Sequence, residues 1–207
     1  MNSQRNPSNR PLSVTFKAVD SRHPYLKERG IFAEVAQRFG VGYFAGNGSM
    51  AGRIVFPIRN RRGEIVAYAG QAIDAAVEPI WKFSSEFQNS FELFGLHEAA
   101  DNPVIVLVES PWCVLALNQA EVPAIALMSC SISQDQQRLL ASLGPVSLVV
   151  LLDGDEPARS AAASIALRLM RQHFVRVVDP PQHKQLDQLG PDELLKLLEL
   201  NSFEPCN

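Results

Sequence analysis

The sequence predicts an α/β protein with a parallel sheet in its C-terminal half and a smaller α+β half before it. Residues 104–108 and 146–152 are apolar runs with the length and composition of buried strands. They belong to a series of four β-runs that alternates with helical patterns as far as residue 178. Strands that alternate with helices pair in parallel, so the helices are expected to flank the sheet.

Composition limits the class of protein. The chain has 207 residues, of which 46% are hydrophobic and 20% charged, as in ordinary globular proteins. A net charge of −3 does not favour a generic nucleic-acid binder. No apolar run approaches the roughly 20 residues of a membrane helix, and the polar N-terminus is unlike a signal peptide. We therefore expect a cytoplasmic protein without a membrane partner.

The chain divides most naturally before Pro103, where the alternating pattern begins. We predict a flexible tail at 1–22, an N-terminal subdomain at 23–101, an α/β domain at 102–200 and a short tail at 201–207. Within the N-terminal subdomain, the local patterns predict three elements besides a hairpin. These are a pair of helices between His23 and Phe39, a flexible glycine-rich connector at 40–48, and a helix from Phe91 to Ala100.

The hairpin and the segment after it carry most of the candidate nucleic-acid contacts. Residues 53–58 and 64–69 flank a basic turn, and Trp81-Lys82-Phe83 follows as a short extended piece. Basic side chains interleaved with aromatic ones suit a nucleic-acid strand. The candidates are Arg53, Arg61, Arg62 and Lys82. For Arg61 and Arg62, a solvated hairpin turn explains the sequence equally well.

Acidic residues follow both central strands at the point where each apolar run ends. Glu109 follows the first run, and Asp153-Gly154-Asp155 follows the second. The carboxyl ends of parallel strands meet at one edge of the sheet, where ligands bind. Crowded carboxylates repel one another unless a cation lies among them, and Mg²⁺ prefers such ligands. The alternatives are helix capping by Glu109 before Pro111, and by Asp155 before a helix with Pro157 in its first turn.

These motifs in this order resemble a known family. Glu109 and Asp153-Gly-Asp155, on strands of an alternating α/β unit, resemble the Toprim domain of primases, topoisomerases and OLD-type nucleases. Four segments resemble the catalytic core of DnaG-type bacterial primases, namely Tyr25 to Gly30, Gly52 to Ile58, Gly63 to Gly70 and Trp81 to Phe83. Three later segments look most like primase-like proteins of mobile elements, namely Leu127-Met128, Ser131 to Gln137 and Lys184 to Leu189.

The resemblance implies metal-dependent nucleotidyl transfer, in which short RNA primers are made on single-stranded DNA from nucleoside triphosphates. It implies Mg²⁺ or Mn²⁺ as cofactor. Glu109, Asp153 and Asp155 would be catalytic and, with Asp187, would bind the metal. Arg53 and Lys82 match basic positions that face template or nucleotide. A separately encoded zinc-binding module and a helicase are the implied protein partners.

The sequence also departs from the family pattern near these motifs. Ser110 stands where the family has glycine, Cys113 and Gln185 where it has acids, and Gln71 where it has arginine. The resemblance still leads us to expect an enzyme. Because of these departures, we keep two rival functions open. One is a non-catalytic Toprim relative that binds DNA, and the other is a Toprim nuclease that cleaves phosphodiesters.

Overall fold

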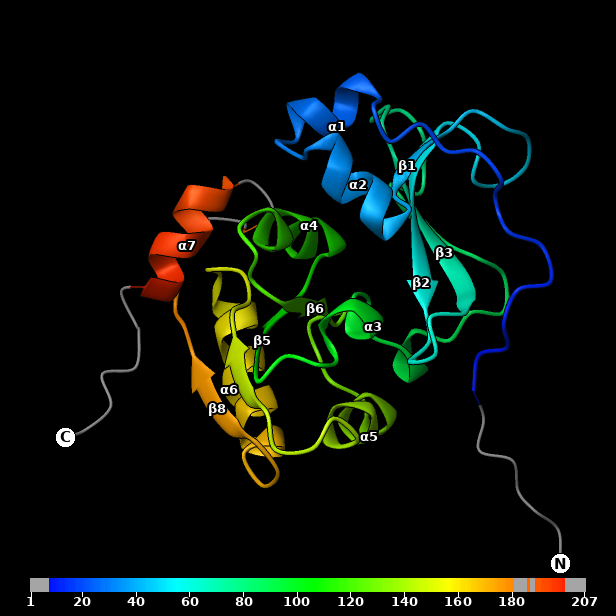
Figure 1. Cartoon of the computed structure of the whole chain (residues 1–207). Helices are drawn as coiled ribbons and strands as arrows, with labels where there is room; N and C mark the ends of the chain where they lie inside the picture. The colour runs from blue at the N-terminus through cyan, green and yellow to red at the C-terminus, as the bar shows by residue number, and fades with distance from the viewer. Residues whose placement is uncertain (1–7, 181–185, 187–188, 200–207) are drawn as a thin grey trace, which may run out of the picture.

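The computed structural model describes residues 8–180, 186 and 189–199 of the chain. They form two four-stranded sheets, an antiparallel one in the N-terminal half and a parallel one in the C-terminal half (Figure 1). The predicted fold class is confirmed. Within this described part of the chain, none of the helices has both the length and the apolar character needed to span a bilayer.

The antiparallel sheet contains the predicted hairpin. Its strands, in spatial order, are β1 (Gly42–Phe44), β2 (Arg53–Arg59), β3 (Ile65–Ala72) and β4 (Trp81–Phe83). One face carries Ile54, Phe56 and Ile58, which pack in the main core with the two helices that precede the sheet. Those helices are α1 (Pro24–Glu28) and α2 (Ala33–Phe39).

Residues 8–22 differ from the prediction of a flexible tail. They run along the other face of the antiparallel sheet, where Leu12, Phe16 and Val19 pack against a small cluster of Met50, Val55 and Tyr68. The Leu12 amide donates to the carbonyl of Ile65 (2.8 Å), so the segment is also held by its backbone. We call residues 8–22 the N-terminal strap.

The parallel sheet follows the predicted alternation of strands and helices. Its strands are, in spatial order, β6 (Ala124–Ala126), β5 (Val104–Val108), β7 (Ser147–Val150) and β8 (Phe174–Val177). The helices are α4 (Pro111–Gln119), α5 (Gln134–Ala141), α6 (Glu156–Leu169) and α7 (Pro191–Glu199). Each of the first three begins at a capping side chain, namely Ser110, Ser133 and Asp155.

Side chains of β5 and β7 alternate between two apolar layers, as the period of a strand requires. Val106 and Val149 face α4 and share a core with the antiparallel sheet, whereas Ile105 and Leu148 face α5 and α6. Because α4 lies between the two sheets, the main core is continuous across both halves of the chain (Figure 1).

Two local predictions were wrong. The connector at 40–48 contains β1, and Gly42 is needed there because a Cβ atom would lie 2.8 Å from the backbone of Asp20. The helix expected from Phe91 to Ala100 is reduced to a 3₁₀ turn at Asn89–Phe91 and to α3 (Leu96–Ala99). Between them, the backbone of Phe94 exchanges two hydrogen bonds with Ala126 at the edge of β6, which replaces helical pairing.

Candidate active site

Glu109 lies at the carboxyl end of β5, directly after the buried Val108. Its backbone carbonyl accepts a hydrogen bond from the amide of Met128 (3.0 Å), which fixes the chain beyond the strand. The side chain is half-buried. It does not cap α4, because the hydroxyl of Ser110 accepts from the amide of Trp112 (3.3 Å) in that role. The capping alternative for Glu109 is therefore excluded.

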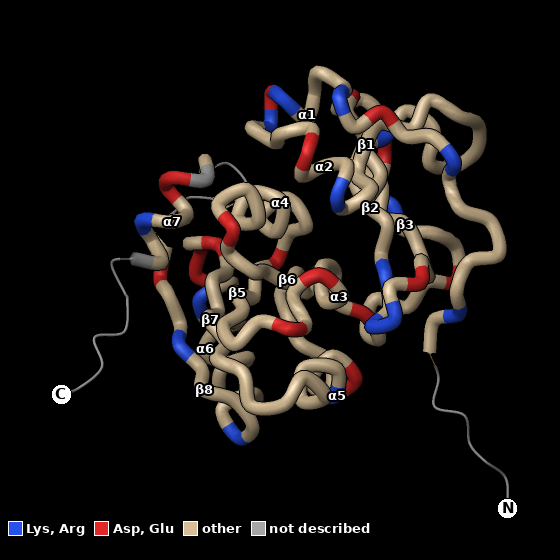
Figure 2. Tube along the Cα trace, viewed as in Figure 1, with Lys and Arg blue, Asp and Glu red and all other residues tan. Residues whose placement is uncertain are grey.

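Asp153 and Asp155 follow β7, which is the parallel neighbour of β5. An Oδ1 oxygen of Asp153 accepts a hydrogen bond from the backbone amide of Leu186 (2.9 Å). Asp155 is the N-cap of α6, and its carboxylate accepts from the amide of Ala158 (2.8 Å). The sheet thus brings all three acidic residues to one edge, where Figure 2 shows acidic segments gathered between α7 and β5.

The three carboxylates influence one another electrostatically. The pKa of Glu109 is raised, first by burial and then by repulsion from Asp153 and from Asp155. Both causes destabilise the ionised form of Glu109. A divalent cation placed among these groups would offset the repulsion, and the oxygen donors suit a hard cation such as Mg²⁺ or Mn²⁺.

The carboxylates do not form a closed ligand set. Among the residues that the structure describes, no three His, Cys, Asp or Glu side chains are close enough together to hold a metal ion. Two of the acidic groups already accept backbone hydrogen bonds, as described above. Asp187, the fourth predicted ligand, lies outside the described residues. The chemistry of the donors fits a divalent cation, while the arrangement of the described ones leaves the coordination sphere open.

A pocket of about 250 Å³ opens beside Glu109 between the two sheets. Trp81 and Phe83 of β4 line one side, and Glu109 and Met128 line the other. Pockets that combine aromatic walls with a few placed polar groups are the usual form of ligand sites. From the sequence, Lys82 was predicted as the functional residue of this segment, with the two aromatic residues beside it. The alternation along a strand was the signal that could have separated them.

Lys82 points away from this pocket. It lies between Trp81 and Phe83 on β4, and it pairs with Gly70 of β3. Successive side chains of a strand face opposite sides of the sheet. Lys82 therefore shares the face of the sheet that the N-terminal strap covers, and its predicted contact with nucleic acid is not directed at Glu109.

Arg53 is only 3% exposed. Its Nη1 donates to the carbonyls of Pro79 (2.8 Å) and Ile80 (2.9 Å) and reaches that of Gly70 (3.4 Å). These contacts tie β2 to β3 and to the segment before β4. A buried guanidinium whose donors are used in this way has a structural explanation, and the predicted nucleic-acid role of Arg53 stays untested.

Arg61 and Arg62 are exposed on the turn between β2 and β3. Arg61 donates to the hydroxyl of Ser142, which caps the C-terminal end of α5. Because α5 leads into the amino end of β7, this turn is at the opposite edge of the parallel sheet from Glu109. The structure does not bring the basic turn and the carboxylates together.

Gln71, which replaces an arginine of the family pattern, is fixed by α4. Its Oε1 accepts a hydrogen bond from the indole of Trp112 (2.6 Å). Trp112 is 2% exposed and also packs edge-on against Phe56 (4.9 Å between ring centroids). The side chain at position 71 therefore joins β3 of the antiparallel sheet to α4. Cys113 is buried in the same core.

Comparisons with known proteins agree with this architecture. Residues 106–189 match a Toprim-like family model. The DNA primase of Salmonella typhimurium is 27% identical over 191 residues, covering 72% of this chain and 32% of the relative. That of Pseudomonas aeruginosa is 28% identical over 245 residues, covering 89% of this chain and 37% of the relative. The chain thus spans about a third of the length of these curated relatives.

Solved structures extend the similarity to the antiparallel half. A DnaG primase catalytic domain bound to single-stranded DNA is 25% identical with a TM-score of 0.72, covering 87% of this chain and 71% of that one. The zinc-binding and RNA polymerase domains of the Aquifex aeolicus primase give 24% identity and a TM-score of 0.73, covering 86% of this chain and 55% of that one. Both halves of the fold therefore occur together in these structures.

Proposed function

Since the chain is a homologue of the DnaG-type primase catalytic core and contains a Toprim domain, we propose that it synthesises short RNA primers on single-stranded DNA. The observation that supports this most strongly is the meeting of Glu109, Asp153 and Asp155 at one sheet edge, where burial and then the two aspartates raise the pKa of the glutamate. A relative's catalytic domain was solved with single-stranded DNA bound.

The carboxylates supply the metal-binding part of the proposal. A Toprim domain implies catalysis with a divalent metal, which stabilises the attacking hydroxyl and the departing pyrophosphate when bound. We propose Glu109, Asp153 and Asp155 as its ligands, with Asp187 as a further one. Because the described carboxylates are not close enough to hold an ion by themselves, substrate phosphates would have to complete the coordination. Ionised Glu109 is also placed to accept a proton or to orient a water molecule at the mouth of the pocket.

The pocket supplies the nucleotide-binding part. The rings of Trp81 and Phe83 offer apolar surface on which a base can stack, beside the acidic edge. Ser110 lines the same pocket, and its hydroxyl is turned toward the helix N-terminus that it caps. A nucleotide whose base is held on β4 would have its phosphates directed toward the carboxylates and their metal.

A primer-synthesis assay tests the proposal. The chain is incubated with oligothymidylate template, ribonucleoside triphosphates and Mg²⁺ or Mn²⁺, and labelled products are separated by length. We expect short RNA products, and a loss of at least about 100-fold in Glu109→Gln or Asp153→Asn, because each removes a charge from the site. Asp135→Asn, which changes an exposed carboxylate paired with Arg138 on α5, is the matched control. Equal activity in all three variants would refute the assignment.

Two observations favour a non-catalytic DNA-binding protein as the second candidate. Gln71 stands in place of an arginine and is bound to Trp112, and the described carboxylates leave the coordination sphere open. This candidate predicts single-stranded DNA binding that does not depend on metal, with no primer product. Nicking of plasmid DNA in the presence of Mg²⁺ would instead indicate the Toprim nuclease.

The remaining proposals concern the context of the chain. We propose that residues 23–101 face the nucleic acid and that residues 102–200 form the Toprim domain. A structure of the Aquifex aeolicus primase includes a zinc-binding domain, so a module of that kind is a proposed partner here, as is a helicase. The mobile-element affinity of the sequence stays a prediction.

A further inference from the structure

Phe32 occupies a position that neither helix capping nor burial explains. It is the N-cap residue of α2, yet its side chain makes no capping hydrogen bond. Serine, threonine, aspartate and asparagine are the residues that stabilise this position. The phenyl group is also 62% exposed, so most of its apolar surface remains in contact with water. A single exposed apolar side chain is common on protein surfaces, so a binding contact is indicated here only together with the groups around the ring.

The turn that carries Phe32 is held rigidly against α4. Gln119, the last residue of α4, accepts a hydrogen bond from the Phe32 amide through Oε1 (2.5 Å). The Nε2 of the same side chain donates to the carbonyl of Gly30 (3.0 Å). This clamp satisfies the backbone of the turn and fixes the point at which the phenyl ring leaves the surface.

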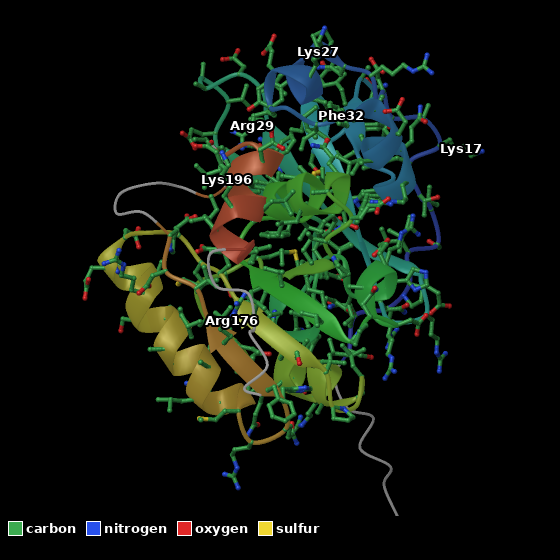
Figure 3. All side chains as sticks on the ribbon, turned by 60° about the vertical axis from the view of Figure 1, so that its left-hand side comes forward. Lys17, Lys27, Arg29, Phe32, Arg176 and Lys196 are labelled. Carbon is green, nitrogen blue, oxygen red and sulfur yellow. The ribbon has the colours of Figure 1, made fainter. Side chains whose placement is uncertain are left out.

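Basic side chains surround the ring. A pocket of about 310 Å³ beside Phe32 is also lined by Arg22 and Lys27. Arg29, which ends α1 three residues before Phe32, has its guanidinium 4.8 Å from the centre of the Trp112 ring. Lys27, Arg29 and Phe32 gather at the end of the molecule next to α7 (Figure 3). Within the described part of the chain, Arg22 and Lys27 form no ion pair. One acidic residue, Glu34, lines the same pocket, and Glu28 follows Lys27 in the sequence.

We propose that Phe32 is a stacking platform for an unpaired base of single-stranded DNA, with Lys27 and Arg22 contacting the adjoining phosphates. Every base offers a π-face to an aromatic ring, and lysine and arginine attract the backbone. Duplex DNA has no free base to offer. This inference rests on the proposed function in one respect, since it takes the bound strand to be the template.

The platform lies at a fixed separation from the candidate active site. Pro111, which lines the pocket beside Glu109, begins α4, and Gln119, which clamps the Phe32 turn, ends it. With a rise of about 1.5 Å per residue, the two ends of α4 are ~12 Å apart. Trp112, whose ring Arg29 contacts, is the second residue of α4. Since residues 111–117 are buried, a strand that stacks on Phe32 would pass over the surface above α4 rather than along the helix itself to reach the pocket.

Binding measurements without metal or nucleotide test the platform separately from catalysis. The probe is a fluorescein-labelled oligothymidylate of about 16 nucleotides, followed by anisotropy. We expect Phe32→Asn to raise the Kd at least about fivefold, because a stacked base is lost. Asparagine is a favoured N-cap residue, so the melting temperature of this variant should be unchanged or higher. Phe32→Trp should bind as tightly as the wild type or more tightly.

Phe174→Asn is the matched control, since this phenylalanine is 75% exposed on β8 and should not contribute. Lys27→Ala should reduce the slope of log Kd against log salt by about 0.7. The proposal is overturned if Phe32→Asn binds like the wild type, if the wild type does not bind the oligonucleotide, or if unlabelled duplex of equal length competes as well as the single strand. Absence of primer synthesis with these binding effects intact would refute the proposed function alone.

Discussion

Glu92 is an acidic residue with no signal in the sequence, yet it is the most strongly buried carboxyl group that the structure describes. It is 4% exposed, and its Oε1 accepts a hydrogen bond from Asn9 of the N-terminal strap (3.3 Å). Burial raises the pKa of Glu92 to about 7, and the Asn9 hydrogen bond offsets only part of that effect. The group is therefore protonated in the folded state at pH values where the unfolded chain is ionised.

This difference makes the stability of the protein dependent on pH. The folded-state pKa of Glu92 lies above the ordinary value of 4.5, so folding is favoured at low pH and that advantage is lost as the pH rises toward 7. Glu92→Gln should remain neutral throughout. We expect its stability relative to the wild type to increase by up to about 3 kcal/mol between pH ~5 and ~8, measured by urea denaturation. Glu28→Gln, at an exposed position, is the control and should show no such trend. If the free energy of unfolding of Glu92→Gln changed with pH in the same way as that of the wild type, the assignment would be contradicted.

The residues that the sequence could and could not identify differ in a physical way. Glu109 and Asp153 were predicted because each follows a buried strand, and a strand end is visible in the apolar pattern. The burial of Arg53 was not predictable, since two of its acceptors, the carbonyls of Pro79 and Ile80, lie in a loop more than twenty residues away. Alternation along β4 puts Lys82 on the opposite face from Trp81 and Phe83, but which of the two faces meets Glu109 depends on the pairing of β4 with β3, which the sequence does not contain.

At the scale of elements, the N-terminal strap is the main departure from prediction. Its apolar residues Leu12, Phe16 and Val19 have the i, i+4, i+7 spacing of a helix face, yet the segment forms neither a helix nor a strand. The exposed outer face of the antiparallel sheet supplies the reason for its order. Phe16 stacks on Phe44 (4.1 Å between ring centroids) and contacts Tyr68 (4.2 Å), whose hydroxyl accepts from the Phe16 amide (3.1 Å).

Phe16→Ala should therefore weaken the attachment of the strap. We expect a loss of about 2 kcal/mol in the free energy of unfolding, below the range for a fully buried phenylalanine because Phe16 is half-buried. Val14→Ala, two residues earlier and 78% exposed, should change stability by less than about 0.5 kcal/mol. Chemical denaturation of both variants measures these free energies of unfolding. Equal, small effects would mean that the strap adds no stability.

The parallel sheet shows the opposite case, in which local pattern and global fold agree. Four apolar runs separated by helical segments restrict the topology to parallel pairing, and the structure has the four strands in one sheet. The segment from Phe91 to Ala100 does not form one helix, because the middle of the segment pairs with a strand that is distant in the sequence. Phe94 bonds to Ala126 at the edge of β6, and Gly95 then adopts a positive φ of 82° that ends any helix there.

At the scale of the whole molecule, function depends on the joint between the two sheets. The pocket beside Glu109 takes one wall from β4 of the antiparallel sheet and the other from the carboxyl edge of the parallel sheet. Trp112 holds this joint through its hydrogen bond to Gln71 and its contact with Phe56. Neither half of the chain contains the candidate site by itself. The sequence could locate the acidic wall but not the aromatic one, since only tertiary packing brings them together.

The same joint makes the response to metal a test of the complete site. Repulsion of Glu109 by Asp153 and Asp155 destabilises the folded protein, and a divalent cation that binds there should relieve it. At a concentration ten times its Kd, Mg²⁺ or Mn²⁺ should increase the free energy of unfolding by about 1.4 kcal/mol, which is measured as a rise in Tm. Asp153→Asn keeps the acceptor for Leu186 but removes the charge, so its Tm should no longer respond. Asp135→Asn should respond like the wild type, whereas an equal response in all three proteins would place the metal elsewhere.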